Sequence, residues 1–160
     1  MSKLSNGSEQ EIICYIDDIV AHKKENLYPQ LCDFLHDNRS NKILDKAGLA
    51  IHTLNYERGL PCLVATILNS KTVNHRSTLI FCCSAFDCSE HLDDFVEVLR
   101  LSNYHAALEA SMIIKENCKI SNNLLRGKIE HIKTIYDGQS EDKKEILDDL
   151  IRFFENQIQV

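Results

Sequence analysis

Hydrophobic residues recur at every third or fourth position along almost the whole chain. From Ile12 to Val20, the isoleucines and the valine fall on one face of a helix, while Glu11 and Asp17 face away. Later segments repeat this spacing, so the pattern predicts a chain that is helical nearly throughout. The predicted helices cover about residues 8–20, 27–36, 42–56, 61–68, 74–86, 89–101, 103–117, 121–136 and 140–158.

Polar turns and special residues set the expected boundaries of these helices. Ser40 is expected to cap the helix that starts at Lys42, and Gly59 is expected to end it, because glycine adopts a left-handed terminus at little cost. Pro61 suits the first turn of the next helix. The apolar run from Thr78 to Phe86 would also suit a β-strand. We favour a helix there because its neighbours on both sides are helical.

The predicted helices are organised in pairs that recur at nearly equal intervals along the chain. The pairs start near Asn26, Leu60, Ser89 and Ser121, and each interval holds two helices joined by a short polar turn. The interval is in the range that is typical of helical repeats. A helix pair of this size cannot cover its own apolar face, so successive pairs must stack. The alternative is a non-repetitive helical bundle in which the similarity between pairs is accidental.

Two passages in successive intervals are alike in detail. Each has an apolar first helix, a turn, a polar or basic residue and a second helix that is small and apolar. The passages are Leu63–Leu68 with Asn74–Ile80, and Phe95–Arg100 with Asn103–Glu109. This pattern resembles the HEAT/armadillo superfamily over residues 60–117. The chain departs from the family at Asn69 and at Leu101-Ser102, where the turn usually holds an aspartate, and at His105, which takes the place of Arg76.

The resemblance implies an all-α fold: a short right-handed α-solenoid of HEAT-like antiparallel helix pairs, with about eight or nine helices. It would form a single domain over residues 1–160, with an extended or disordered N-terminus over about residues 1–7. The stretch from Asn74 to His91 also looks like small bacterial HEAT-like proteins. Some of these accompany secreted or contact-delivered toxins as immunity proteins, as in contact-dependent growth inhibition.

Composition and charge narrow the functional classes. The chain has 24 acidic and 18 basic residues, a net charge of −6, which disfavours nucleic acid and favours a basic partner. Five glycines and two prolines are too few for an all-β chain. No apolar run is long enough to cross a membrane, and the N-terminus has no apolar signal core. Seven cysteines without framework spacing are typical of a reduced, cytoplasmic protein.

Two arrangements could carry chemistry. Cys83, Cys88 and His91, with Cys118, could supply zinc ligands, but structural zinc usually binds paired C-x2-C units, so we predict no metal and no cofactor. Arg126 and His131, with four residues between them, resemble the catalytic motif of HEPN ribonucleases. That family usually has a polar residue directly after the arginine, where this chain has glycine, and the surrounding charge is acidic. We therefore predict that the chain is not an enzyme.

Acidic residues at helical spacing are more informative. One set lies on the 89–101 helix and another on the last helix, where three- and four-residue steps place the carboxylates on one face. These are either solvated outer faces or a docking surface for a cationic partner. The predicted partner contacts are Tyr56, Glu57, Tyr104, His105, Glu109, Glu116, Asp142, Glu145 and Asp149.

These patterns lead to a specific functional hypothesis. We expect an immunity protein that neutralises a basic bacterial toxin by stoichiometric docking. A nuclease would fit, because its cationic phosphate-binding surface attracts an acidic inhibitor. The alternative is a HEAT-like adaptor or scaffold that binds a peptide or subunit, and an HEPN-like ribonuclease ranks third. Neither nucleic acid nor a membrane is an expected partner.

Overall fold

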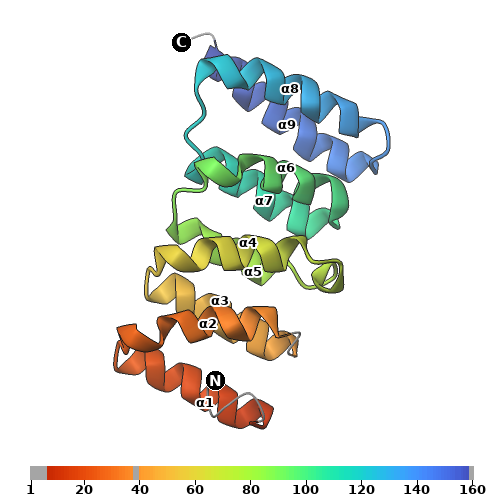
Figure 1. Ribbon diagram of the computed structural model, residues 1–160. Coiled ribbons are helices and arrows are strands. Elements are labelled where there is room, and N and C mark those ends of the chain that lie inside the picture. The colour runs from red at the N-terminus through yellow and green to blue at the C-terminus, as the bar shows by residue number, and fades with distance from the viewer. Residues whose placement is uncertain (1–6, 38–39, 159–160) are drawn as a thin grey trace. The chain divides into compact units, whose positions relative to one another are not determined.

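The computed structural model describes residues 7–37 and 40–158 (Figure 1). Most of the expected extended N-terminus (residues 1–6) lies outside the described residues. Within them the chain forms nine α-helices and no strand, which confirms an all-α fold with eight or nine helices. The helices are α1 (Glu9–Ala21), α2 (Tyr28–His36), α3 (Asn41–Thr53), α4 (Leu60–Leu68), α5 (Ser77–Cys82), α6 (Leu92–Leu101), α7 (Tyr104–Asn117), α8 (Asn122–Tyr136) and α9 (Glu141–Ile158). None of the helices so described is both long and apolar enough to span a bilayer.

The chain divides into two compact units, residues 1–86 and residues 87–160. In the first unit, α2 pairs with α3 and α4 pairs with α5, and the two pairs stack through α2–α4 and α3–α5 contacts. Helix α1 packs against α3. In the second unit, α6 pairs with α7 and α8 pairs with α9, and α7 packs against α9. Each unit is therefore built from stacked antiparallel helix pairs, which is a repeat-like arrangement (Figure 1).

The first helices of three pairs begin at a constant interval along the chain. Helices α2, α4 and α6 begin at Tyr28, Leu60 and Leu92, and a 3₁₀ turn precedes each of them. These turns are η1 (Glu25–Leu27), η2 (Glu57–Gly59) and η5 (Ser89–His91). Buried residues recur at the same interval. The side chain at the fourth position of each of the three helices is almost fully buried: Leu31, Leu63 and Phe95. This spacing is more regular than the intervals between helix starts that the sequence suggests.

Side-chain caps explain several helix starts. Ser8 and Glu11 form a capping box at the start of α1, and the Asn103 side chain accepts a hydrogen bond from the backbone N–H of Ala106 at the start of α7. Ser40 occupies the expected cap position before α3, but its hydroxyl donates to the Glu9 carboxylate instead of accepting from the helix. It therefore ties α3 to α1.

The expected role of Gly59 and the expected end of the 42–56 helix are both wrong. Helix α3 ends at Thr53, and Asn55 takes the left-handed conformation, with φ of 48°. Gly59 has φ of −80°, which any residue can adopt. Its smallness is required for packing, because a Cβ at this position would lie 2.5 Å from Cγ2 of Ile51.

The expected helix over 74–86 is shorter in the structure. Helix α5 covers only Ser77–Cys82 and is followed by a 3₁₀ turn, η4 (Cys83–Ala85). The preceding residues fold back onto the end of α4, where the Thr72 hydroxyl donates to the Thr66 and Asn69 carbonyl oxygens at 2.7 and 2.8 Å. The guanidinium of Arg76, a residue that is only 2% exposed, also donates to the Asn69 carbonyl. These bonds hold the segment in turns and delay the helix.

Candidate functional site

Helix α7 is apolar on two sides. One side is buried in the second unit and consists of small and branched residues: Ala106, Ala107, Ala110, Ser111, Ile113 and Ile114. The other side carries Tyr104, Leu108 and Met112, which are 40%, 38% and 44% exposed. Residues four apart lie one above the other on a helix, so these three form a stripe about 12 Å long. An exposed apolar stripe on a helix that already has a full core face is typical of a binding surface.

Helix α9 brings acidic residues beside this stripe. The Lys115 ammonium binds the Asp149 carboxylate and lies 5.9 Å from the centre of the Phe153 ring. Because α7 and α9 run in the same direction (Figure 1), residues one and two turns earlier on each helix fall alongside one another. Glu145 is therefore level with the end of the stripe, near Met112, and Asp142 with its middle, near Leu108.

We call this surface the α7–α9 face. It consists of Tyr104, His105, Leu108, Glu109, Met112, Glu116, Asp142, Glu145 and Asp149. Seven of the nine predicted contacts lie on it, on the two second helices of the unit's pairs. The structure thus places most of the predicted site on one side of one unit.

The negative charge of the chain is concentrated in the second unit. Residues 87–160 contain 15 acidic and 9 basic residues, whereas residues 1–86 contain nine of each, so the net charge of −6 belongs to the second unit. Four carboxylates of the α7–α9 face form no ion pair among the described residues: Glu109, Glu116, Asp142 and Glu145. The nearby cations are Lys115, which is bound to Asp149, and Arg152. The face therefore keeps a net negative charge that a partner can neutralise.

The acidic face of α6 is different, although it looks similar in the sequence. Asp93 binds the Lys128 ammonium, Asp94 lies 2.9 Å from a ring nitrogen of His91, and Glu97 accepts two hydrogen bonds from Arg100. Three of its four carboxylates thus have a partner within the second unit. Within residues 7–37 and 40–158, Glu90 is the one carboxylate of this set that forms no ion pair or side-chain hydrogen bond.

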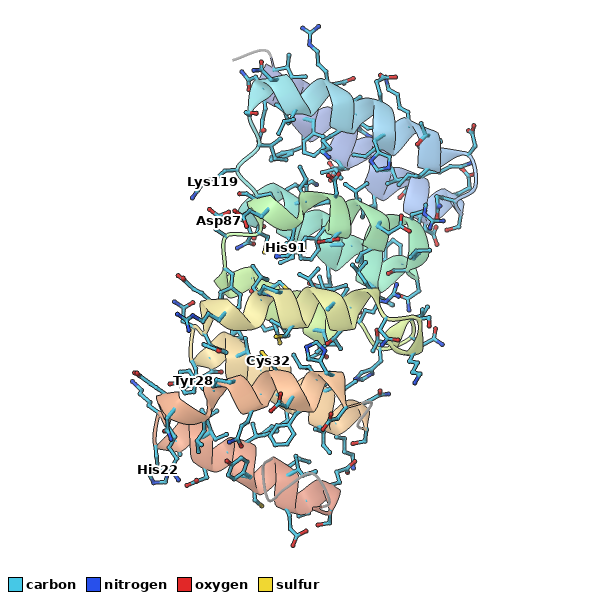
Figure 2. The ribbon with its side chains drawn as sticks, viewed as in Figure 1. His22, Tyr28, Cys32, Asp87, His91 and Lys119 are labelled. Carbon is cyan, nitrogen blue, oxygen red and sulfur yellow. The ribbon has the colours of Figure 1, made fainter. Side chains whose placement is uncertain are left out.

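A hydrogen-bonded cluster holds the C-terminal end of α7 in place (Figure 2). The Asp87 carboxylate accepts from the backbone N–H of Ser89 at 3.1 Å, from the Ser89 hydroxyl, and from the Lys119 ammonium at 2.7 Å. The backbone N–H of Lys119 donates to the Ser89 hydroxyl oxygen at 2.8 Å, and that of Cys88 donates to the Asn117 carbonyl. The start of the second unit is thereby tied to the α7–α8 connection. Lys119 and then Ser89 hold the pKa of the Asp87 carboxyl well below its ordinary 3.8.

Replacing Asp87 by asparagine is expected to weaken the fold at neutral pH and to make it less sensitive to acid. The folded pKa of Asp87 lies below its unfolded value, so its ionised form stabilises the fold above about pH 4, and this stabilisation is lost as the pH falls through the folded pKa. The difference in melting temperature between the natural chain and Asp87→Asn should therefore narrow between pH 7 and pH 3. Asp137→Asn is the control, because this exposed carboxylate makes no hydrogen bond among the described residues. A constant difference across this range would contradict the prediction.

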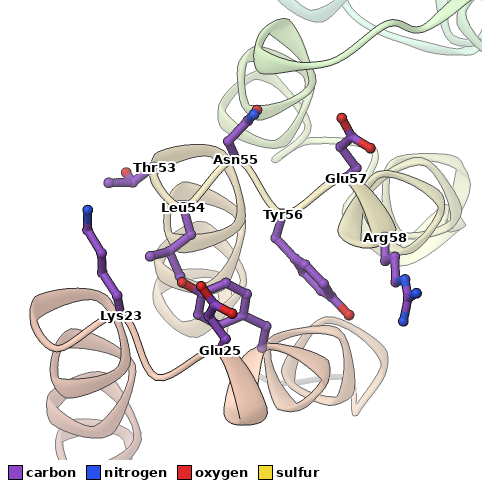
Figure 3. A pocket seen from close by; sticks show the side chains of 9 residues that line it. Lys23, Glu25, Thr53, Leu54, Asn55, Tyr56, Glu57 and Arg58 are labelled. Atoms are coloured by element: carbon purple, nitrogen blue, oxygen red, sulfur yellow. The ribbon is translucent and has the colours of Figure 1, made fainter.

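The other two predicted contacts, Tyr56 and Glu57, lie in the first unit and are not part of the α7–α9 face. They line an open pocket of about 530 Å³ between the α1–α2 and α3–α4 connections (Figure 3). The Tyr56 and Tyr28 rings pack edge to face, with 5.3 Å between their centres. Burial raises the pKa of the Tyr56 hydroxyl. Lys23 and Arg58 balance the charges of the two glutamates in the pocket, so it has no net charge to attract a basic partner.

No family model, curated protein or solved structure matches this chain.

The cysteines considered above as zinc ligands, Cys83, Cys88 and Cys118, are all at least partly buried. Burial raises the pKa of both Cys88 and Cys118 to about 12, so these thiols are protonated at neutral pH and are poor nucleophiles. Cys83 belongs to the first unit, and its thiol donates to the Leu79 carbonyl. No group of three His, Cys, Asp or Glu side chains within residues 7–37 and 40–158 is arranged to hold a metal ion.

Arg126 and His131 do not converge. Both are exposed on α8, which is continuous from Asn122 to Tyr136. Five residues on a regular helix correspond to a rotation of about 140°, so the two side chains leave α8 in different directions. General-base catalysis on a phosphate would require both groups at one substrate. The arrangement does not favour this chemistry.

The predicted contacts include Tyr104 but not the other two residues of the apolar stripe. Leu108 and Met112 are not among the predicted contacts, because the alanine and isoleucine side is the apolar stripe that the pattern assigns to this helix. The sequence does hold a clue to this second set. Once the alanine and isoleucine side is assigned to the core, Tyr104, Leu108 and Met112 remain as apolar residues at four-residue spacing on the outer side of the helix.

Proposed function

We propose that this chain is a non-enzymatic protein-binding module that docks a basic protein on the α7–α9 face. The observation that carries this proposal is the combination of an exposed apolar stripe with adjacent carboxylates that lack ion pairs in the described structure. The apolar stripe would supply affinity as its area is buried, and the carboxylates would select a cationic partner and accelerate its association.

We further propose that the partner is a toxin and that the chain is its immunity protein. The support is the resemblance to small HEAT-like immunity proteins, together with the net charge of −6. A toxin that acts on nucleic acid needs a cationic surface for phosphates, and an acidic face placed over it would exclude the substrate. The complex would form in the cytoplasm, where the seven cysteines, all free in the structure, would remain reduced.

The test is co-expression with the protein encoded by the neighbouring reading frame, followed by affinity measurement. Reversing three carboxylates of the face, with Glu116→Lys, Asp142→Lys and Glu145→Lys together, should weaken binding at least tenfold and flatten its dependence on salt. The control is Glu90→Lys, Asp137→Lys and Glu155→Lys together, which changes the net charge equally at exposed positions outside the face. Equal losses in both variants would show that only overall charge matters and would refute the docking face.

The first unit supports a second candidate function, an adaptor that binds a peptide or subunit. On α5, Phe81 is 48% exposed, and its ring lies 5.1 Å from the ring of His52 on α3. Phe81 and His52 would offer an aromatic contact, and the pocket near Tyr56 would offer polar contacts without net charge. If the neighbouring protein is not a toxin, and binding depends on Phe81 but not on the carboxylates of the α7–α9 face, the adaptor function is correct.

A further inference from the structure

We infer that the α7–α9 face receives an amphipathic helix of its partner, with apolar residues along one side and Lys or Arg on both flanks. This inference rests on the proposed function, because it assumes that the face binds a basic protein. It adds the secondary structure and the residue pattern of the segment that docks.

Backbone hydrogen bonding favours a helix over an extended segment. Both helices that form the face use their backbone groups internally, and the described residues include no strand whose edge a partner could extend. An extended segment lying on Leu108 and Met112 would bury its own N–H and C=O groups against apolar side chains without partners, which is costly. A helix satisfies these groups internally and presents only side chains.

The dimensions and chemistry of the stripe match such a helix. From Tyr104 to Met112 the stripe extends about 12 Å, or slightly more than two helical turns, so it can contact residues at positions i, i+4 and i+7 of a partner. The unbranched methionine adapts to side chains of different shape. The partner therefore needs a narrow apolar side without strict identity at each position.

Carboxylates lie on both sides of the stripe. On the α9 side are Asp142 and Glu145. The opposite side holds Glu109 and Glu116, because Lys115, which contacts α9, precedes Glu116 by one position and so lies about 100° away on the helix. A partner helix lying along the stripe would therefore meet negative charge on both flanks. Basic residues on both borders of its apolar side would pair with them.

The test uses a synthetic 18-residue peptide with leucines at positions i, i+4, i+7 and i+11 and lysines on both borders, labelled with fluorescein. Fluorescence anisotropy measures its affinity for the full chain, and circular dichroism measures the helix gained on binding. The comparison peptides are a scrambled sequence of the same composition and a version with proline in its middle. We expect the amphipathic peptide to bind at least tenfold more tightly than either and to gain helix.

Variants of the full chain locate the binding. Leu108→Ser with Met112→Ser should weaken binding of the amphipathic peptide at least tenfold. Leu124→Ser is the matched control, because Leu124 is a more exposed leucine, at 56%, on another helix of the same unit. An equal loss in both would overturn the inference.

The outcomes separate this inference from the proposed function. If the scrambled peptide binds equally well, the partner helix is refuted. It is also refuted if no peptide binds while the neighbouring protein still binds through the face, and in that case the proposed function stands. If neither the peptides nor the neighbouring protein depends on the face, both are refuted.

Discussion

Replacing Lys143 by methionine is expected to lower the free energy of unfolding by about 1–3 kcal/mol. Lys143 is only 8% exposed, and its ammonium donates to the carbonyl oxygens of Arg100 at 3.1 Å and Ser102 at 2.9 Å. These carbonyls lie at the C-terminal end of α6, where no further helical turn supplies N–H donors. Methionine fills a similar volume but leaves the carbonyls without this donor, and removing one partner of a buried hydrogen bond is costly.

Lys144→Met is the matched control for this prediction. The Lys144 ammonium pairs with Glu141, which lies at the exposed start of α9, at 2.8 Å. Exposed pairs of this kind contribute about 0–1 kcal/mol, so the control should lose far less stability. Urea denaturation of both variants gives the comparison. If the two variants lose equal stability, Lys143 does not cap α6 in the way that the structure implies.

Replacing Gly59 by alanine is expected to destabilise the first unit by about 1–3 kcal/mol. The added Cβ would lie 2.5 Å from Cγ2 and 3.1 Å from Cγ1 of Ile51, and 3.1 Å from Cδ1 of Tyr56. Ile51 is fully buried, so its side chain cannot move away without disturbing the core. The backbone of Gly59 is ordinary, so this loss would come from packing and not from an altered φ.

Replacing Gly127 by alanine is expected to stabilise the protein, in contrast to the same change at Gly59. Gly127 lies within α8, and a Cβ there would have no atom within 4 Å. Alanine should therefore stabilise the helix by up to about 1 kcal/mol, because glycine is the poorer helix former. Thermal unfolding of both variants measures the two effects. A destabilised Gly127→Ala or an unchanged Gly59→Ala would contradict the packing described for these positions.

Helix positions and most boundaries followed from local patterns. Three- and four-residue spacing located all nine α-helices of the described chain, and residues such as Asn103 mark where they start. The failures occurred where distant contacts override local preference. Gly59 looks like a helix terminus in the sequence, but the side chain of Ile51, eight positions earlier, explains why a glycine is needed there. In the same way, Thr72 and Arg76 bind carbonyls at the end of α4 and shorten α5.

The sequence by itself determined the all-helical class, the pairing of helices at a nearly regular interval and the excess of acidic residues, because these depend on periodicity and composition. Only the tertiary structure decided which carboxylates are paired with a cation of the same chain. Asp93 and Glu116 look alike in the sequence, but Asp93 binds Lys128 on α8, far along the chain, whereas Glu116 has no ion pair in the described structure. The structure likewise decided which side of α7 faces the core. Both outcomes depend on which helices pack together, and neighbours along the chain do not specify that.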